Sequence, residues 1–174
     1  MKRPSLPSAT VLAALLVAAP TQLRAATPST EADAGAIVLR PLSLLKKNDM
    51  NFGTLATSPA AGTATLNPVT RLVTTTGGVT ALAIGTAPSP ATFLGAGSKN
   101  APYQIRLPKT PITLTRVGGT ETMTVSNWTT DGPTNRNIGA NNAFQFNVGA
   151  QVAVGANQIG GTYVGTFDVT VHYP

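Results

Sequence analysis

Few residues in this chain could carry out chemistry, and they are far apart in the sequence. The chain has one histidine, His172, and no cysteine. A single imidazole without a neighbouring carboxylate or nucleophile cannot form a catalytic relay. The absence of cysteine excludes thiol chemistry, a disulfide framework and every zinc site that needs sulfur. We therefore expect His172 to be a solvated side chain on the polar face of a strand.

The acidic residues are equally sparse. There are six in the chain, and two of them, Glu31 and Asp33, lie in a polar segment near the N-terminus. The other four are Asp49, Glu121, Asp131 and Asp168. No two of these four are neighbours in sequence, so nothing indicates the paired carboxylates of a glycosidase. We predict that the protein is not an enzyme, with no catalytic residues and no cofactor.

One polar loop and one tryptophan are the remaining candidates for a binding site. The loop contains a single carboxylate, whereas calcium sites usually recruit several, so we expect no metal there. Its polar residues are Asp131, Asn135, Asn137, Asn141 and Asn142. Trp128 is expected to be packed in the core or at its rim, and the alternative is a platform that stacks on a sugar.

The elements around these residues are predicted to be short β-strands. The chain has 17 Gly and 14 Pro but only 10% charged residues, a composition typical of strands joined by tight turns. Apolar residues recur at every second position in short runs, which indicates half-buried strands and an antiparallel β-sandwich of the immunoglobulin-like class. The expected strands are residues 36–45, 50–55, 64–66, 71–75, 79–84, 91–94, 103–107, 112–116, 122–128, 143–148, 151–154 and 162–173.

Glycine and proline set the expected breaks between these strands. Pro41 should interrupt or bulge the first strand, because proline cannot donate to a β-ladder. Gly118-Gly119 predicts a hairpin turn, and we assign Gly77-Gly78 and Gly160-Gly161 to turns of the same kind. The alternation predicts a core made of Phe52, Phe93, Ile105, Leu107, Ile112, Leu114, Met123, Val125, Phe144, Phe146, Val148, Val152 and Val154.

The first 25 residues have the features of a signal peptide. A basic start at Lys2-Arg3 precedes an apolar run from Thr10 to Ala19, which is shorter than the roughly 20 residues that span a bilayer. We predict cleavage after Ala25, a flexible leader over residues 26–35 and one domain over residues 36–174. No other segment is apolar enough to span a membrane. The remaining basic residues form no dense stripe, so we expect no nucleic-acid partner.

Several segments resemble a family of secreted bacterial proteins, the domain-of-unknown-function 4402 family. They are Met50-Asn51-Phe52-Gly53-Thr54-Leu55, the run from Tyr103 to Pro108, Met123-Thr124-Val125 and, above all, the C-terminal run FNVGAQVAVGANQIGGTYVGTFDVTVHYP from Phe146 to Pro174. The resemblance covers residues 36–174. It implies an exported β-domain and leaves the biochemical role open.

The C-terminal run also resembles, more loosely, that of pilin subunits of the chaperone–usher type. Those subunits end in an alternating apolar strand with a penultimate tyrosine and a glycine fourteen residues from the end, positions held here by Tyr173 and Gly161. The resemblance implies a candidate assembly strand formed by Gly161, Tyr163, Phe167, Val169, Val171 and Tyr173. It also implies an assembly chaperone, fimbrial subunits or further copies of the chain as partners. An ordinary closed sandwich remains the alternative.

Two functions therefore compete. The first is an exported structural or interaction protein of the bacterial cell envelope, such as a fimbrial subunit, located in the periplasm, at the cell surface or outside the cell. The second is a secreted binding module that recognises a glycan or surface polymer through Trp128 and the loop at residues 131–142. If the first is right, a segment from Ala34 to Leu45 is the expected donor of an intermolecular strand.

Overall fold

The computed structural model describes residues 33–174, and it confirms an all-β chain. The predicted signal peptide and most of the predicted leader lie outside the described residues. Residues 37–174 form one compact unit. Among residues 33–174, no helix is long and apolar enough to cross a bilayer. The strands are β1 (Ser43–Asn48), β2 (Thr54–Ala56), β3 (Gly62–Leu66), β4 (Val73–Gly77), β5 (Thr80–Leu82), β6 (Ala91–Ala96), β7 (Pro102–Arg106), β8 (Ile112–Arg116), β9 (Thr122–Thr130), β10 (Asn135–Asn137), β11 (Ala143–Val154), β12 (Tyr163–Val164) and β13 (Thr170–His172).

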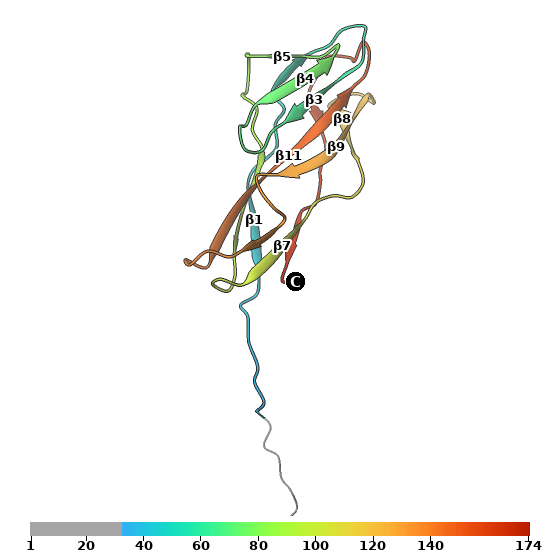
Figure 1. Ribbon diagram of the computed structural model, residues 1–174. Helices are drawn as coiled ribbons and strands as arrows, with labels where there is room; N and C mark the ends of the chain where they lie inside the picture. Colours follow the sequence, from blue (N-terminus) through green and yellow to red (C-terminus); the bar gives the residue numbers. More distant parts are fainter. Residues whose placement is uncertain (1–32) are drawn as a thin grey trace, which may run out of the picture. The chain divides into compact units, whose positions relative to one another are not determined.

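The main sheet is built around β11, which runs through the middle of the domain (Figure 1). All of its pairings are antiparallel: β6 pairs with the first half of β11, β3 with the second half, and β9 along the other edge. The prediction of two strands separated by Gly149-Ala150 is wrong, because β11 continues through these residues with a shift in register. A side chain at Gly149 would collide with the carbonyl oxygen of Leu66, so this close approach requires glycine.

Two smaller sheets complete the fold. One has the order β10-β7-β13 and the other pairs β2 with β5. Strand β10 lies inside the segment that the sequence predicts to be a polar loop, since Asn135 to Asn137 pair with β7. One main sheet and two small antiparallel sheets fit a sandwich, while the sandwich arrangement and its immunoglobulin-like topology remain predictions.

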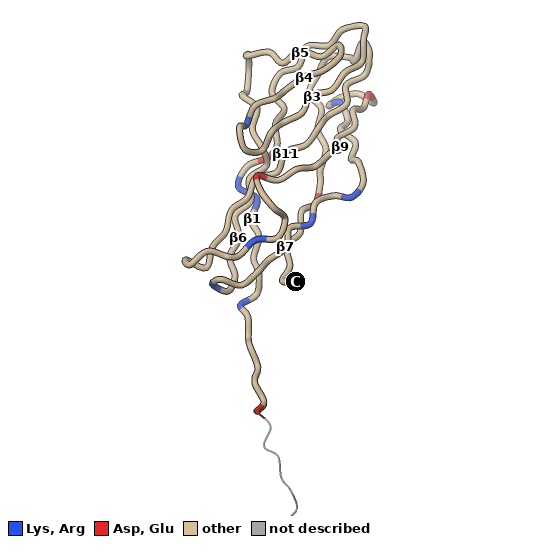
Figure 2. Tube along the Cα trace, in the orientation of Figure 1, with Lys and Arg blue, Asp and Glu red and all other residues tan. Residues whose placement is uncertain are grey.

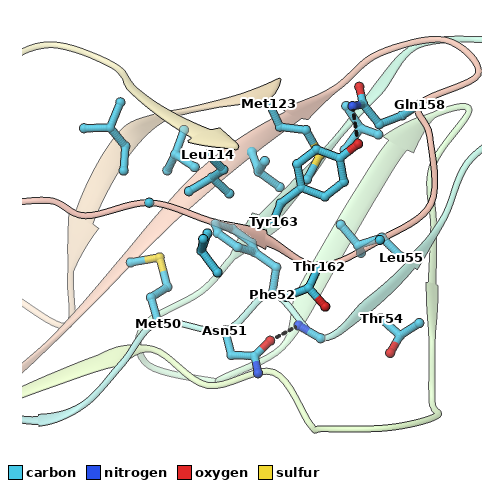
Figure 3. A pocket seen from close by; sticks show the side chains of 18 of the residues that line it. Met50, Asn51, Phe52, Thr54, Leu55, Leu114, Met123, Gln158, Thr162 and Tyr163 are labelled. Carbon is cyan, nitrogen blue, oxygen red and sulfur yellow. Dashed lines mark hydrogen bonds between the residues drawn. The ribbon is translucent and has the colours of Figure 1, made fainter. Parts of the chain in front are cut away.

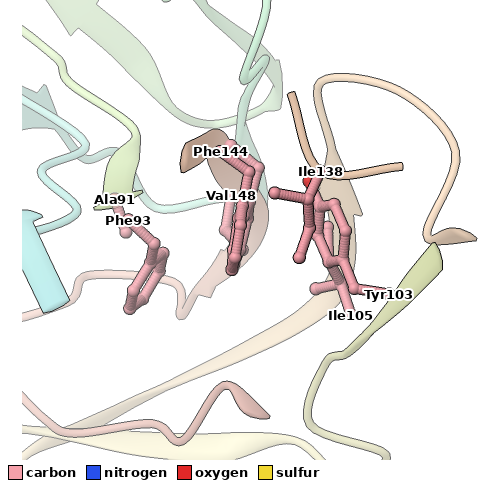
Figure 4. Close-up of a cluster of buried hydrophobic side chains, with 8 residues drawn as sticks. Ala91, Phe93, Tyr103, Ile105, Ile138, Phe144 and Val148 are labelled. Carbon is pink, nitrogen blue, oxygen red and sulfur yellow. The ribbon is translucent and has the colours of Figure 1, made fainter. Parts of the chain in front are cut away.

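The first of two buried clusters is aromatic (Figure 4). Phe146 is 0% exposed and stacks on Phe93 at a ring-centroid distance of 5.2 Å. Phe144 stacks on Tyr103 at 4.2 Å. This cluster, the aromatic core, contains Ala91, Phe93, Tyr103, Ile105, Ile138, Phe144, Phe146 and Val148. The alternation of the strands predicted five of these residues. It missed Ile138, which stands alone among the polar residues of the predicted loop.

The second cluster contains smaller side chains and lies along the other half of β11. This cluster, the valine core, consists of Ala64, Val79, Val125, Ala150, Val152 and Val154. Phe52, Ile112, Leu114 and Met123, all predicted to be core residues, pack against it but are only partly buried. The side chains on this half of the main sheet are therefore less completely covered than those of the aromatic core.

The first strand begins later than the sequence predicts. Ordered pairing starts at Ser43 and continues to Asn48, with a bulge between Lys46 and Asn48, and β6 is the partner. Residues 33–40 belong to no strand, and Ile37 and Val38 are 91% and 92% exposed. Pro41 explains the boundary, since it has no backbone N–H to donate to a ladder.

The last strand is interrupted, whereas the sequence predicts one strand over residues 162–173. Strand β12 pairs with β8 at the edge of the main sheet, and β13 pairs with β7 in the small sheet. The connection at residues 165–169 passes from one sheet to the other. Nevertheless, the predicted apolar face is confirmed in this region, because Phe167, Val169, Val171 and Tyr173 all pack against the aromatic core.

Candidate functional site

The polar residues that could carry out chemistry are not brought together. His172 is half-buried on β13 and lies opposite Gln104 of β7. No group of three or more His, Cys, Asp or Glu residues that could hold a metal ion occurs between residues 33 and 174. Figure 2 shows Lys and Arg spread along the trace rather than gathered in one stripe. Three acids of the described residues form ion pairs: Asp49 with Lys46 at 2.5 Å, Glu121 with Arg116 at 2.6 Å and Asp131 with Arg136 at 2.8 Å.

The Arg116–Glu121 pair joins the two ends of the β8–β9 turn. The hydrogen bond from the Arg116 guanidinium is the main reason why the pKa of Glu121 is lowered from its ordinary value. The pair lies beside Gly118-Gly119, where the predicted hairpin turn between β8 and β9 is confirmed. Because no second acid accompanies it, the pair fixes a turn rather than forming a reactive site.

The loop that follows β9 uses its polar groups to hold itself in place. Besides its bond to Arg136, the Asp131 carboxylate accepts the backbone N–H of Asn147 at 3.0 Å. The Asn142 side chain accepts the backbone N–H of Lys99 at 3.1 Å, and the Asn141 side chain accepts that of Ala143 at 3.2 Å. These groups therefore already have partners within the domain.

Trp128 lies between the two buried clusters and packs against both of them. Its ring is tilted against Phe167 at a centroid distance of 4.7 Å. This contact supports the prediction of a packed residue over a platform for a sugar ring. The indole Nε1 is buried and has no hydrogen-bond partner in the described part of the chain.

This unpaired donor leads to a test by substitution. We expect Trp128→Phe to change the free energy of unfolding by less than about 1 kcal/mol, because the lost packing is offset by removal of a donor that costs about 1–3 kcal/mol when buried unpaired. Urea unfolding followed by circular dichroism measures the difference. Trp128→Ala is the control and should cost about 3–5 kcal/mol. A cost above about 2 kcal/mol for the phenylalanine variant would show that Nε1 has a partner.

A groove lies beside the valine core (Figure 3). Its volume is about 760 Å³. One wall is the segment 49–57, which includes β2, and the other is the segment 158–165, which includes β12. The floor is formed by β8, β9 and β11 through Ile112, Leu114, Met123, Val125, Val152 and Val154.

The groove has an apolar floor, and polar groups such as those of Asn51, Gln158 and Thr162 lie along its walls. Figure 3 shows Phe52, Leu114, Met123 and Tyr163 around the same space. Among the residues that line it, Asp49 is the one that carries a charge. Within the described residues, β2 pairs only with β5 and β12 pairs only with β8, so the strand in each wall has one edge without a strand partner. The groove thus combines apolar surface with unpaired strand edges.

A family model, a domain of unknown function (DUF4402), matches residues 42–173, which include every strand described above. The chain belongs to the DUF4402 family. No curated protein and no solved structure matches the chain. The match confirms the membership that the C-terminal run and the Met50–Leu55 segment suggest, and it assigns no biochemical activity.

This DUF4402 domain divides the predicted assembly strand between two places. Gly161, Tyr163 and Phe167 line the groove. Val169, Val171 and Tyr173 pack on the aromatic core, and Phe167 contacts this core as well as the groove. The Tyr163 hydroxyl donates to the carbonyl oxygen of Ile159 at 2.7 Å and accepts from the Gln158 side chain at 2.7 Å, which fixes this wall. The predicted strand is therefore half groove wall and half core.

Within the predicted donor segment, residues 34–39 are exposed and belong to no strand. In the DUF4402 domain Ser43 to Leu45 belong to β1, and Leu42 and Leu44 pack on the aromatic core. The donor prediction of Ala34 to Leu45 is therefore wrong at its C-terminal end. Sequence reasoning missed this boundary because Leu42, Leu44 and Leu45 look the same as Ile37 to Leu39 in a hydropathy pattern.

Proposed function

We propose that this DUF4402 protein is a non-catalytic structural subunit of the bacterial cell envelope that assembles head to tail. In this proposal its groove receives an apolar strand from a second copy. The observation that carries the proposal is the groove itself, which has an apolar floor and two walls that contain strands with unpaired edges. An added strand would bury side chains in the groove and complete the backbone hydrogen bonds of a wall.

The donor is proposed to be the exposed segment at residues 34–39. Gly35, Ile37 and Leu39 alternate along it, so they would share one face in an extended strand. Ile37 is 91% exposed, so its apolar side chain faces solvent. Burying the Ile37 and Leu39 side chains would stabilise a complex by about 1.5–3 kcal/mol each.

The geometry favours a second copy over the same chain as the donor. Strand β1 alone separates Leu42 from Asp49, where the groove wall begins, by roughly 20 Å. Ile37 is three residues from Arg40, which a fully extended chain covers in about 10 Å. Residues 37–39 are therefore too close to the start of the domain to fold back into their own groove.

Export is part of the proposal and is supported by the basic start and the apolar run of residues 10–19. A strand that fills the groove before assembly would come from an assembly chaperone, because an unfilled apolar groove with open strand edges promotes aggregation. The assembly chaperone and the second copy would both bind the unfilled groove. The donor segment of the second copy would replace the strand of the chaperone.

The proposal is tested with the chain from Ala26 onward and a synthetic peptide of residues 33–41. We expect the chain to form concentration-dependent oligomers in sedimentation equilibrium and the free peptide to dissociate them. The fluorescence of Trp128, which lines the groove, should shift when the peptide binds. A peptide with aspartate at the position of Ile37 is the control and should do neither. A chain that stays monomeric over a roughly hundredfold range of concentration, with no shift on adding peptide, would refute the proposal.

A further inference from the structure

The penultimate residue of the chain joins the C-terminal strand to the root of the N-terminal extension. The Tyr173 hydroxyl donates a hydrogen bond to the carbonyl oxygen of Arg40 at 2.7 Å. It also accepts one from the backbone N–H of Ser98 at 2.9 Å. A third hydrogen bond, from the Arg40 N–H to the Ser98 hydroxyl at 2.6 Å, links the remaining two of these three residues. We call these three residues the clasp.

The backbone is shaped to let this hydroxyl approach. A methyl group at Gly97 would lie 2.7 Å from the Tyr173 hydroxyl oxygen, 2.6 Å from Cδ1 of Ile138 and 2.8 Å from Cδ2 of Leu42. Gly97 is thus enclosed by three side chains that meet at the clasp. The ring of Tyr173 packs on the aromatic core, so the hydroxyl is held by a rigid support.

The clasp holds the last fixed point before the exposed apolar segment. Arg40 forms hydrogen bonds through both its N–H and its carbonyl oxygen, whereas Ile37 and Val38, three and two residues earlier, are almost fully exposed. Arg40 is therefore a residue whose backbone is anchored to the domain on both sides, directly before the exposed apolar segment. In Figure 1 the C-terminus, which carries the clasp, lies at the end of the domain opposite β5.

We propose that the Tyr173 hydroxyl is a positioning group that ties the donor extension to the terminal strand and so fixes the angle between successive copies in an assembly. This inference rests on the proposed function. Tension along an assembled chain would enter the domain at Arg40. The clasp would pass it to β13 through Tyr173 and to the β6–β7 connection through Ser98. Without the hydroxyl, the groove and the donor remain, so copies would still join, but at variable angles.

The first test is made on the unassembled chain. In Tyr173→Phe the Ser98 N–H loses its acceptor, and we expect its amide hydrogen to exchange about five to ten times faster, with a smaller increase at Arg40. Tyr103→Phe is the matched control, because it removes the hydroxyl of another core tyrosine and should leave both amides unchanged. Gly97→Ala is a second variant and should act in the same direction as Tyr173→Phe. Unchanged exchange at Ser98 and Arg40 in Tyr173→Phe would overturn the clasp.

The second test is made on assemblies by electron microscopy. Wild-type and Tyr103→Phe chains should form straight assemblies, and Tyr173→Phe chains should form assemblies of similar number with a broader distribution of angles between neighbouring domains. If all three assemble with the same distribution, the positioning role is wrong while the proposed function stands. If the wild-type chain does not assemble at all, the proposed function fails, and the positioning role, which depends on it, fails with it.

Discussion

Ile37→Asp is expected to weaken self-association of the chain by more than about a hundredfold. The change removes about 1.5–3 kcal/mol of apolar burial and places a carboxylate against an apolar groove floor, where it has no cation to pair with among the lining residues. Sedimentation equilibrium of the chain from Ala26 onward measures the effect. The monomer itself should be as stable as the wild type, because Ile37 is 91% exposed in it.

Val38→Asp is the matched control for this experiment. Val38 is 92% exposed in the monomer, so the two substitutions start from the same environment and introduce the same charge. In an extended donor the two side chains point in opposite directions, and Val38 would face solvent. Val38→Asp should therefore leave self-association within about threefold of the wild type. Equal loss in both variants would indicate a general effect of charge and would exclude an inserted strand.

Phe146→Ala is expected to lower the free energy of unfolding by about 3–5 kcal/mol. Phe146 is 0% exposed and lies in the middle of β11, with Phe93 stacked at 5.2 Å and Phe144 at 6.4 Å. Its neighbours are anchored in three strands and can close only part of the cavity. For a domain of ordinary stability, about 5–15 kcal/mol, this is a large fraction of the total. Urea unfolding at 25 °C measures it.

Phe52→Ala provides the comparison with the other half of the domain. Phe52 lines the groove and is only partly buried, so the same chemical change should cost about 1–2 kcal/mol. A cost equal to that of Phe146→Ala would mean that the groove is closed in solution. It would thereby contradict the open groove on which the proposed assembly depends.

The sequence was sufficient for the features that depend on local alternation. Side chains on one face of a strand repeat at every second residue, and this pattern correctly placed Phe144, Phe146 and Val148 in the core and identified the inward face of Phe167 to Tyr173. It also located the β8–β9 turn from Gly118-Gly119. Membership of the DUF4402 family followed from short motifs at Met50 and near the C-terminus.

The candidate site could be predicted only in part. The sequence pointed to the C-terminal strand and to a donor before β1, but it gave no sign that Phe52, Met123 and Tyr163 surround one hollow. These residues come from segments far apart in the chain. Their arrangement depends on which sheet each segment joins, and periodicity along a single strand carries no such information.

Tertiary structure alone decided where the strands begin, end and change partners. Residues 162–173 alternate in sequence, yet β12 and β13 belong to different sheets because the connection between them passes from one sheet to the other. Leu44 and Ile37 are equally apolar, yet Leu44 is held in the ladder with β6 and packs on the aromatic core, whereas Ile37, before Pro41, is left exposed. An apolar pattern indicates that the free energy falls when these side chains are removed from water. Whether a side chain is buried, and against which surface, depends on partners from distant parts of the chain. Here these partners partly bury Leu44 in the domain and leave Ile37 exposed.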